Sequence, residues 1–195
     1  MTFDISSGTE APTADPTEAP PAAAPSYGTV LSHQKVSGTM GGFTGSLAEN
    51  DYFGWSCSSV GGDLNGDGVL DLVVGTYGDN DGAYSAGAVY ILFMQTNGNV
   101  LSHQKVSATH GGFTGSLAAD DYFGISSASV GGDLNGDGVL DLVVGAIGDD
   151  DGASRAGAVY ILFFEGISSI CVQLVFLVIV VFVCIPIDPN DINDV

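Results

Sequence analysis

Basic residues are almost absent from this chain. Lys35, Lys105 and Arg155 stand against 23 Asp and Glu, and the formal net charge is −20. Nucleic-acid binding needs a basic surface that neutralises phosphates, so this composition excludes it. A surface of this sign attracts cations instead. For the acidic residues outside the loops described below, general solubility is the other interpretation.

Cysteine is scarce too, and the signatures of catalysis are missing. Three cysteines, an odd number without zinc-ligand spacing, indicate neither a disulfide framework nor a zinc site. No nucleophile elbow, phosphate loop or dinucleotide fingerprint occurs. His33 and His103 occupy equivalent places in a repeated segment, which favours surface positions on outer strands over a catalytic base. The sequence therefore predicts a protein that is not an enzyme.

Proline is concentrated at the N-terminus. Five of the seven prolines lie in residues 1–28, among many Ala and Thr. Such a segment supplies no apolar core, so residues 1–28 are predicted to be a disordered leader. They lack the basic start and the apolar stretch of a secretory signal peptide.

An internal repeat fills the middle of the chain. Residues 31–94 align without a gap on residues 101–164 and differ at 13 of 64 positions. Identity this high between tandem copies indicates one structural unit used twice. We therefore expect a first repeat over residues 29–98 and a second over residues 99–165.

Each repeat contains four short strand-like runs separated by turns rich in Gly, Asn and Asp. In the first repeat they cover residues 29–37, 54–60, 70–77 and 87–94. The last run is apolar on both faces and is predicted to be a buried interior strand. Trp55, whose counterpart is Ile125, is predicted to pack in the core. The expected fold is all-β, with two four-stranded antiparallel blades of the propeller type.

A loop rich in oxygen donors recurs in both repeats, with the sequence Gly-Gly-Asp-Leu-Asn-Gly-Asp-Gly-Val-Leu-Asp. Calcium takes about six to eight hard oxygen ligands, and donors at alternate loop positions can converge on one point. The predicted ligands are Asp63, Asn65, Asp67, Val69 (through its carbonyl) and Asp71, and in the second repeat Asp133, Asn135, Asp137, Val139 and Asp141. The sequence thus predicts two Ca²⁺ sites. The alternative is a metal-free turn of Asp and Asn residues, in which the carboxylates would repel one another.

The loop is not an EF-hand. Val74 and Val144 stand where an EF-hand requires a bidentate Glu, and a strand follows instead of a helix. Further acidic residues, Asp79, Asp81 and 149–151, lie at the predicted hairpin tips. They are interpreted as solvated turns or accessory cation sites, rather than as the paired acids of a glycosidase.

The combination of motifs resembles the FG-GAP repeat of integrin α-subunit propellers. The matching segments are Phe53-Gly54, Gly75-Thr76-Tyr77 and Gly87-Ala88-Val89-Tyr90, and in the second copy Phe123-Gly124, Gly145-Ala146-Ile147 and Gly157-Ala158-Val159-Tyr160. Neither copy has the Pro of the GAP triplet. Integrin-type propellers also use seven such repeats, whereas this chain has two.

The resemblance implies a blade whose calcium loop joins its first two strands. It also implies that each blade takes its outer strand from the start of the next repeat, so that Val100–Ser107 completes the first blade. Residues 29–37 would then pair with the exposed edge of strand 156–163, within one chain or between chains as a homo-oligomer. In the family such repeats bind ligands or mediate adhesion, mostly outside the cell.

After residue 165 the repeat pattern stops. Residues 167–187 carry no charge and are apolar except for Ser168, Ser169 and Gln173. Their length suits a membrane-spanning helix, which needs roughly 20 residues. An acidic tail, residues 188–195, follows. The Val- and Ile-rich composition leaves an apolar strand as the alternative. Because two blades close no ring and no signal peptide precedes them, we expect a truncated chain or a misread gene model.

The sequence therefore predicts a calcium-binding, integrin-α-like module for ligand binding or cell adhesion, anchored in a membrane through residues 167–187. Its partner would be a protein or glycan of unknown identity. The alternative is a secreted, calcium-stabilised structural or accessory domain of a larger protein.

Overall fold

The computed structural model describes residues 28–165, 169–176 and 179–186. The chain divides after His33 into two units. Residues 28–33, the described part of the first unit, form no helix or strand. The predicted leader falls almost wholly outside the described residues, and its disorder stays a prediction.

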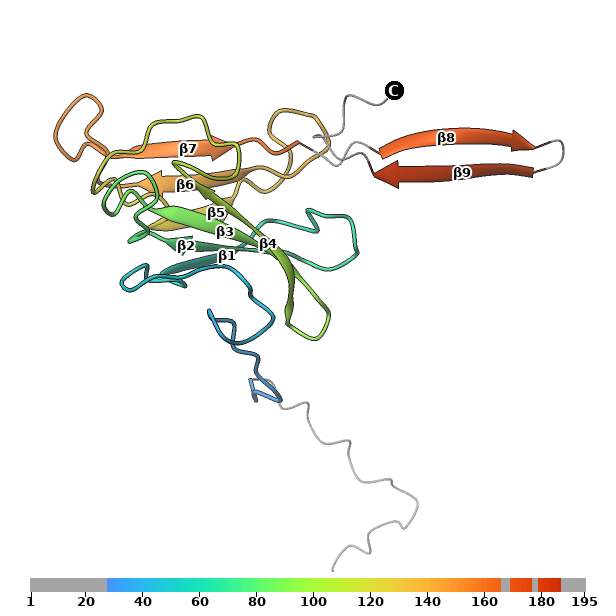
Figure 1. Cartoon of the computed structure of the whole chain (residues 1–195), viewed down its shortest axis with the longest axis horizontal. Helices are drawn as coiled ribbons and strands as arrows, with labels where there is room; N and C mark the ends of the chain where they lie inside the picture. The colour runs from blue at the N-terminus through green and yellow to red at the C-terminus, as the bar shows by residue number, and fades with distance from the viewer. Residues whose placement is uncertain (1–27, 166–168, 177–178, 187–195) are drawn as a thin grey trace, which may run out of the picture. The chain divides into compact units, whose positions relative to one another are not determined.

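The first sheet has four antiparallel strands in chain order (Figure 1). They are β1 (Ser56–Ser59), β2 (Leu72–Thr76), β3 (Ala88–Met94) and β4 (Val100–Ser107). Because β4 opens the second repeat, the expected sharing of an outer strand is confirmed for this sheet. The predicted strand over residues 29–37 is wrong for the described chain: only an isolated bridge from Ser37 to Met40 forms there.

The second sheet contains three strands, β5 (Ser126–Ser129), β6 (Leu142–Ala146) and β7 (Ala158–Leu162). Within the described residues β7 pairs only with β6. The expectation of four strands in both sheets therefore holds for the first sheet alone. The physical reason is the sharing of strands: a repeat builds three strands of its own sheet, and the fourth comes from the opening residues of another repeat.

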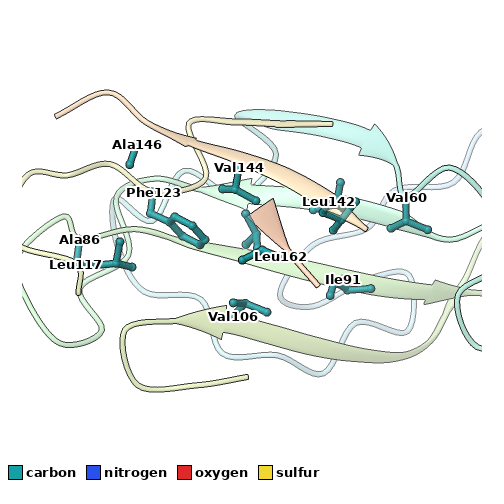
Figure 2. Close-up of a cluster of buried hydrophobic side chains, with 12 residues drawn as sticks. Val60, Ala86, Ile91, Val106, Leu117, Phe123, Leu142, Val144, Ala146 and Leu162 are labelled. Carbon is teal, nitrogen blue, oxygen red and sulfur yellow. The ribbon is translucent and has the colours of Figure 1, made fainter. Parts of the chain in front are cut away.

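One apolar core joins the two repeats (Figure 2). Val89 and Ile91 of β3 are fully buried against side chains of the second repeat, among them Phe123 and Leu142. The alternate residues Tyr90 and Leu92 point to the other face of β3, as the two-residue period of a strand requires. There they pack with Phe43 in a second core. Both faces of β3 are covered, so the predicted buried interior strand is confirmed.

The Phe-Gly pair of the second repeat fixes the junction between the repeats. The backbone N–H of Phe123 donates to the carbonyl of Ala86 at 2.9 Å. Gly124 has a φ of 88°, and a Cβ there would lie 2.2 Å from the carbonyl oxygen of Ala88. Only glycine allows this close approach of two backbones. The motif therefore serves packing between the sheets.

After the second repeat, β8 (Ser169–Phe176) and β9 (Ile179–Pro186) form an antiparallel hairpin that pairs with no other described strand. Among the described residues, no helix has the length and apolar character needed to cross a membrane. The predicted span over residues 167–187 includes positions outside the described ranges, and membrane insertion stays a prediction.

Candidate functional site

The two oxygen-rich loops join the first two strands of each sheet, at the place that the resemblance implies. The carboxylate of Asp63 accepts backbone N–H bonds from Gly66, Asp67 and Gly68 at 2.6, 3.1 and 2.6 Å. These bonds, that from Gly68 foremost, lower the pKa of Asp63. Asp133 is held at the same three distances in the second repeat.

Asn65 and Asp67 lie over the same stretch of backbone. The Asn65 side-chain amide donates to the Asp67 carboxylate at 3.0 Å, and the N–H of Val69 donates to the other Asp67 oxygen at 2.8 Å. The counterparts Asn135, Asp137 and Val139 are arranged alike. Each loop thus brings together the first three of its predicted side-chain ligands. In the described parts of the chain, no group of three or more His, Cys, Asp or Glu converges as a metal site.

The last predicted ligand of each loop has a structural role that sequence reasoning missed. Asp71 is fully buried, and its two carboxylate oxygens accept N–H bonds from Leu64 at 2.9 Å and from Met94 at 3.0 Å. It therefore ties the loop to the end of β3. In the second repeat, Asp141 accepts from Leu134 at 2.7 Å, but its other oxygen is buried without a partner among the described residues.

The donor chemistry of the loops fits a hard cation. Carboxylate, amide and carbonyl oxygens are the ligands that calcium prefers, and no sulfur or imidazole takes part. The ten predicted ligands remain candidates for binding Ca²⁺.

A second acidic group lies between β2 and β3, where the sequence left a solvated turn or a cation site open. It lines a pocket of about 410 Å³. Lys105 of β4 places its ammonium 2.6 Å from the carboxylate of buried Asp79 and 2.7 Å from that of Asp81. His110 Nδ1 lies 2.8 Å from Asp81. The cation of this pocket is thus a lysine supplied by the next repeat.

The pKa shifts follow from this geometry. Burial raises the pKa of Asp81, but hydrogen bonds from Lys105 and Ser107 outweigh it, and the net shift is downward. Burial likewise opposes the charge of Lys105, yet its bonds to Asp79 and Asp81 raise the pKa of the ammonium. Asp81 and Lys105 are therefore both ionised at neutral pH.

In the described part of the chain, the equivalent acidic group of the second repeat has no such partner. Asp121 and Asp149 are buried there, and within the described residues no Lys or Arg forms an ion pair with them. Tyr160 donates to the Asp149 carboxylate at 3.1 Å, and burial together with this bond raises the pKa of Tyr160 to about 12. Burial also raises the pKa of Asp121, with a further contribution from the charge of Asp149.

His33 is exposed, as predicted, and His103 lies on the outer strand β4, where it is half-buried. Its ring lies 4.9 Å from that of Phe43 and 5.7 Å from that of Tyr90, so it packs over the second core. The role of Lys105 was also missed. A signal for it exists in the sequence, because two of the three basic residues stand at the same place in the two repeats.

Comparisons with known proteins agree with these features. A family model described as FG-GAP repeat matches residues 58–92 and 125–162. Each match reaches from the first to the third strand of its sheet and includes the oxygen-rich loop. Integrin alpha-PS2 of Drosophila melanogaster is 35% identical over 116 residues, covering 57% of this chain. The chain spans 8% of the length of that relative.

The Lys105 pocket yields a stability prediction. Lys105→Met leaves Asp79 buried without its counter-ion. We expect the unfolding free energy at pH 7 to fall by about 2 kcal/mol. This loss is smaller than the cost of breaking a fully buried ion pair because the lysine is partly exposed. Gln104→Met, on the exposed side of β4, should change the unfolding free energy by less than about 0.5 kcal/mol. Urea unfolding of the full chain measures both.

The pH dependence of this loss follows from the pKa shifts. The folded-state pKa of Asp81 lies below its unfolded value, so the stabilisation is present above about pH 4 and is lost as pH falls through the folded pKa. The pKa of Lys105 is raised, so at the alkaline end the stabilisation is lost as pH rises past about 10.5 through the folded value. A Lys105→Met deficit that stays constant from pH 7 to pH 3 would contradict the assignment.

Proposed function

We propose that this chain, an FG-GAP repeat protein resembling the integrin α-subunit, is a calcium-stabilised module for ligand binding or cell adhesion. The relative it resembles is an integrin α-subunit by name, and the chain covers a small part of it. The proposal therefore rests on this chain's own surface as well.

The observation that carries the binding function is an aromatic cluster made of the exposed Tyr52 and Trp55 and the half-buried Tyr77 and Tyr122. Tyr52 stacks on Tyr77 with ring centroids 5.0 Å apart, and Trp55 meets the same ring edge-on at 4.9 Å. Tyr122 of the second repeat adds an edge contact to Tyr77 at 5.8 Å. The prediction that Trp55 packs in the core is wrong, because 59% of its surface is exposed.

Such a cluster suits recognition. Tyr and Trp offer rigid apolar area with a polar tip and are enriched among the residues that dominate binding energy at interfaces. The rings hold one another in place across the junction of the two repeats, so little side-chain freedom is lost when a ligand binds. A protein or a glycan is the ligand class that flat aromatic faces fit.

In this proposal the calcium ions hold the loops. Ca²⁺ at Asp63, Asn65, Asp67, Val69 and Asp71, and at their counterparts in the second repeat, would relieve repulsion between carboxylates and stabilise the folded state by binding to it alone. Sites of this kind fill in the calcium concentrations found outside cells. The repeats are therefore proposed to be extracellular.

Residues 167–187 are proposed to anchor the module in the membrane. We expect the full chain to resist carbonate extraction from membranes, whereas a version ending at residue 165 is released, because the apolar run is long enough to span the bilayer. The measurement is the fraction of protein that carbonate releases from membranes, for the full chain and for the version ending at residue 165. Equal release of the two would contradict the anchor and favour the apolar-strand alternative.

The second candidate function is a secreted, calcium-stabilised accessory domain of a larger protein. It is favoured by the small share of its relative that the chain spans. In that case calcium stabilises the fold, but the aromatic cluster binds no ligand. Both candidates predict the calcium sites, so the binding test below is the one that separates them.

The calcium test is a titration calorimetry experiment on the full chain. We expect two sites per chain, with Asp67→Ala and Asp137→Ala each removing one, because each substitution deletes a carboxylate ligand. Glu49→Ala, an exposed acid outside the loops, removes the same charge and should leave both sites. No calcium heat at millimolar concentration from a folded sample would refute the sites.

The binding test exposes immobilised matrix proteins and a glycan array to the full chain with calcium and with a chelator. We expect at least one calcium-dependent ligand, and a loss of affinity of about thirtyfold on Trp55→Ala, the effect of removing a central aromatic anchor. Met40→Ala, an exposed apolar residue outside the calcium loops and the aromatic cluster, is the matched control. If Trp55→Ala binds as tightly as the control, the cluster is not the binding surface.

A further inference from the structure

The open edge of β7 is the counterpart of an edge that β4 fills in the first repeat. There, β4 pairs with β3 in a register that sets Lys105 opposite Tyr90 and His103 opposite Leu92. The N–H of Val100 donates to the carbonyl of Gly41 at 2.8 Å. The approach is so close that a Cβ on Gly42 would lie 2.6 Å from the carbonyl oxygen of Val100.

In the second repeat the same frame is present, but no fourth strand pairs with β7 among the described residues. A Cβ built on Gly112, the counterpart of Gly42, meets no atom within 4 Å. A groove of about 320 Å³ runs there between the Gly112–Phe113 turn and β7. β7 ends at Leu162, two residues before Phe164, the counterpart of Met94. The N–H of Met94 serves Asp71 in the first repeat, whereas the matching oxygen of Asp141 has no partner.

The chain carries a segment that fits this frame. Residues 31–37 repeat residues 101–107 of β4 without a single difference, including Lys35 at the position of Lys105. In the described structure the segment is not a strand, and Val30 and Leu31 are 79% and 94% exposed. Lys35 therefore has the charge opposite to that of Asp149 and Asp151, and its segment has the sequence of the strand that fills the edge of the first sheet.

The apolar surface beside this edge is also uncovered. Val159 and Ile161 of β7 are 67% and 45% exposed, whereas their counterparts Val89 and Ile91 are fully buried under the second repeat. The second repeat reaches that face because β4 leads directly into it. A copy that donated its opening strand to β7 would bring its own first repeat onto Val159 and Ile161 in the same way.

A second copy is the donor that the geometry favours. Within one chain, Val36 and Leu47 pack on the core of Phe43, Tyr90 and Leu92. The second repeat covers the opposite face of β3. The first sheet thus lies between Val36, near the start of the Gln34–Val195 unit, and the second sheet.

We propose that residues 30–37 of a second copy add to β7 as a fourth antiparallel strand, with Lys35 of that copy placed between Asp149 and Asp151. The register follows from β3 and β4: Lys35 stands opposite Tyr160, and His33 opposite Leu162. The contact is heterologous, so each copy offers one strand and one edge, and a closed ring or an open chain results. This association is independent of calcium and of the ligand in the proposed function.

Zero-length carbodiimide coupling of the full chain in mild detergent tests this pairing. A mixture of unlabelled and ¹⁵N-labelled chains distinguishes coupling between copies from coupling within one. We expect peptides that join Lys35 to Asp149 or Asp151 and carry mixed labels. Coupling of Lys105 to Asp79 or Asp81, which are 2.6 and 2.7 Å away in one chain, is the built-in positive control and should carry a single label.

A matched pair of variants gives an independent readout by analytical ultracentrifugation. Lys35→Gln and Gln34→Glu each lower the net charge by one at adjacent positions, and only the first removes the ammonium. We expect Lys35→Gln to abolish the mixed-label peptides and to raise the dissociation constant by roughly tenfold or more, while Gln34→Glu keeps both.

Three results would each overturn the proposal. They are Lys105 coupling without any Lys35 coupling, Lys35 coupling to Asp149 or Asp151 with a single label throughout, and equal association of the two variants. The detergent disperses the apolar residues 167–187 in both variants alike, so association through them does not distinguish the pair.

Discussion

The ion pairs that Lys105 makes with Asp79 and Asp81 are the constraint on which the arrangement of the two repeats depends. A lysine from one repeat neutralises buried carboxylates of the repeat before it, and the strand that carries this lysine closes the edge of the first sheet. Burying Asp79 without the ammonium would be costly, so the start of the second repeat stabilises the first sheet. The repeats are therefore interdependent in stability, although each sheet has its own strand order.

The strong negative charge is accommodated in two chemically different ways. In the hairpin pocket, a side-chain ammonium lies within hydrogen-bond distance of the acids, and its position is fixed by the register of β4. In the loops, Asp63 and Asp133 are satisfied by backbone N–H groups, which lower the pKa of both carboxyls. The first arrangement joins repeats to one another. The second keeps each loop folded in a shape whose oxygens suit the proposed calcium ion.

Much of the fold could be predicted from the sequence because local patterns determine it. The apolar run of β3, the turn-rich loops and the tandem identity indicate an all-β repeat, and the resemblance supplies the origin of β4. The fate of residues 31–37 could not be predicted. They are identical to residues 101–107, yet only the second copy is a strand, since pairing depends on which sheet edge is within reach. The exposure of Trp55 could not be predicted for a related reason, because the burial of a side chain depends on which other side chains pack against it.

The sharing of an outer strand has a consequence for the gene as well. A segment that runs from one donated strand to the next is a complete unit of duplication: inserting another copy adds a sheet and fills the edge of the sheet before it. However many units are added by unequal crossing-over, the array keeps a single donor strand at one end and a single acceptor edge at the other. Repeat number can therefore change in evolution without an intermediate that exposes more unpaired backbone than its parent.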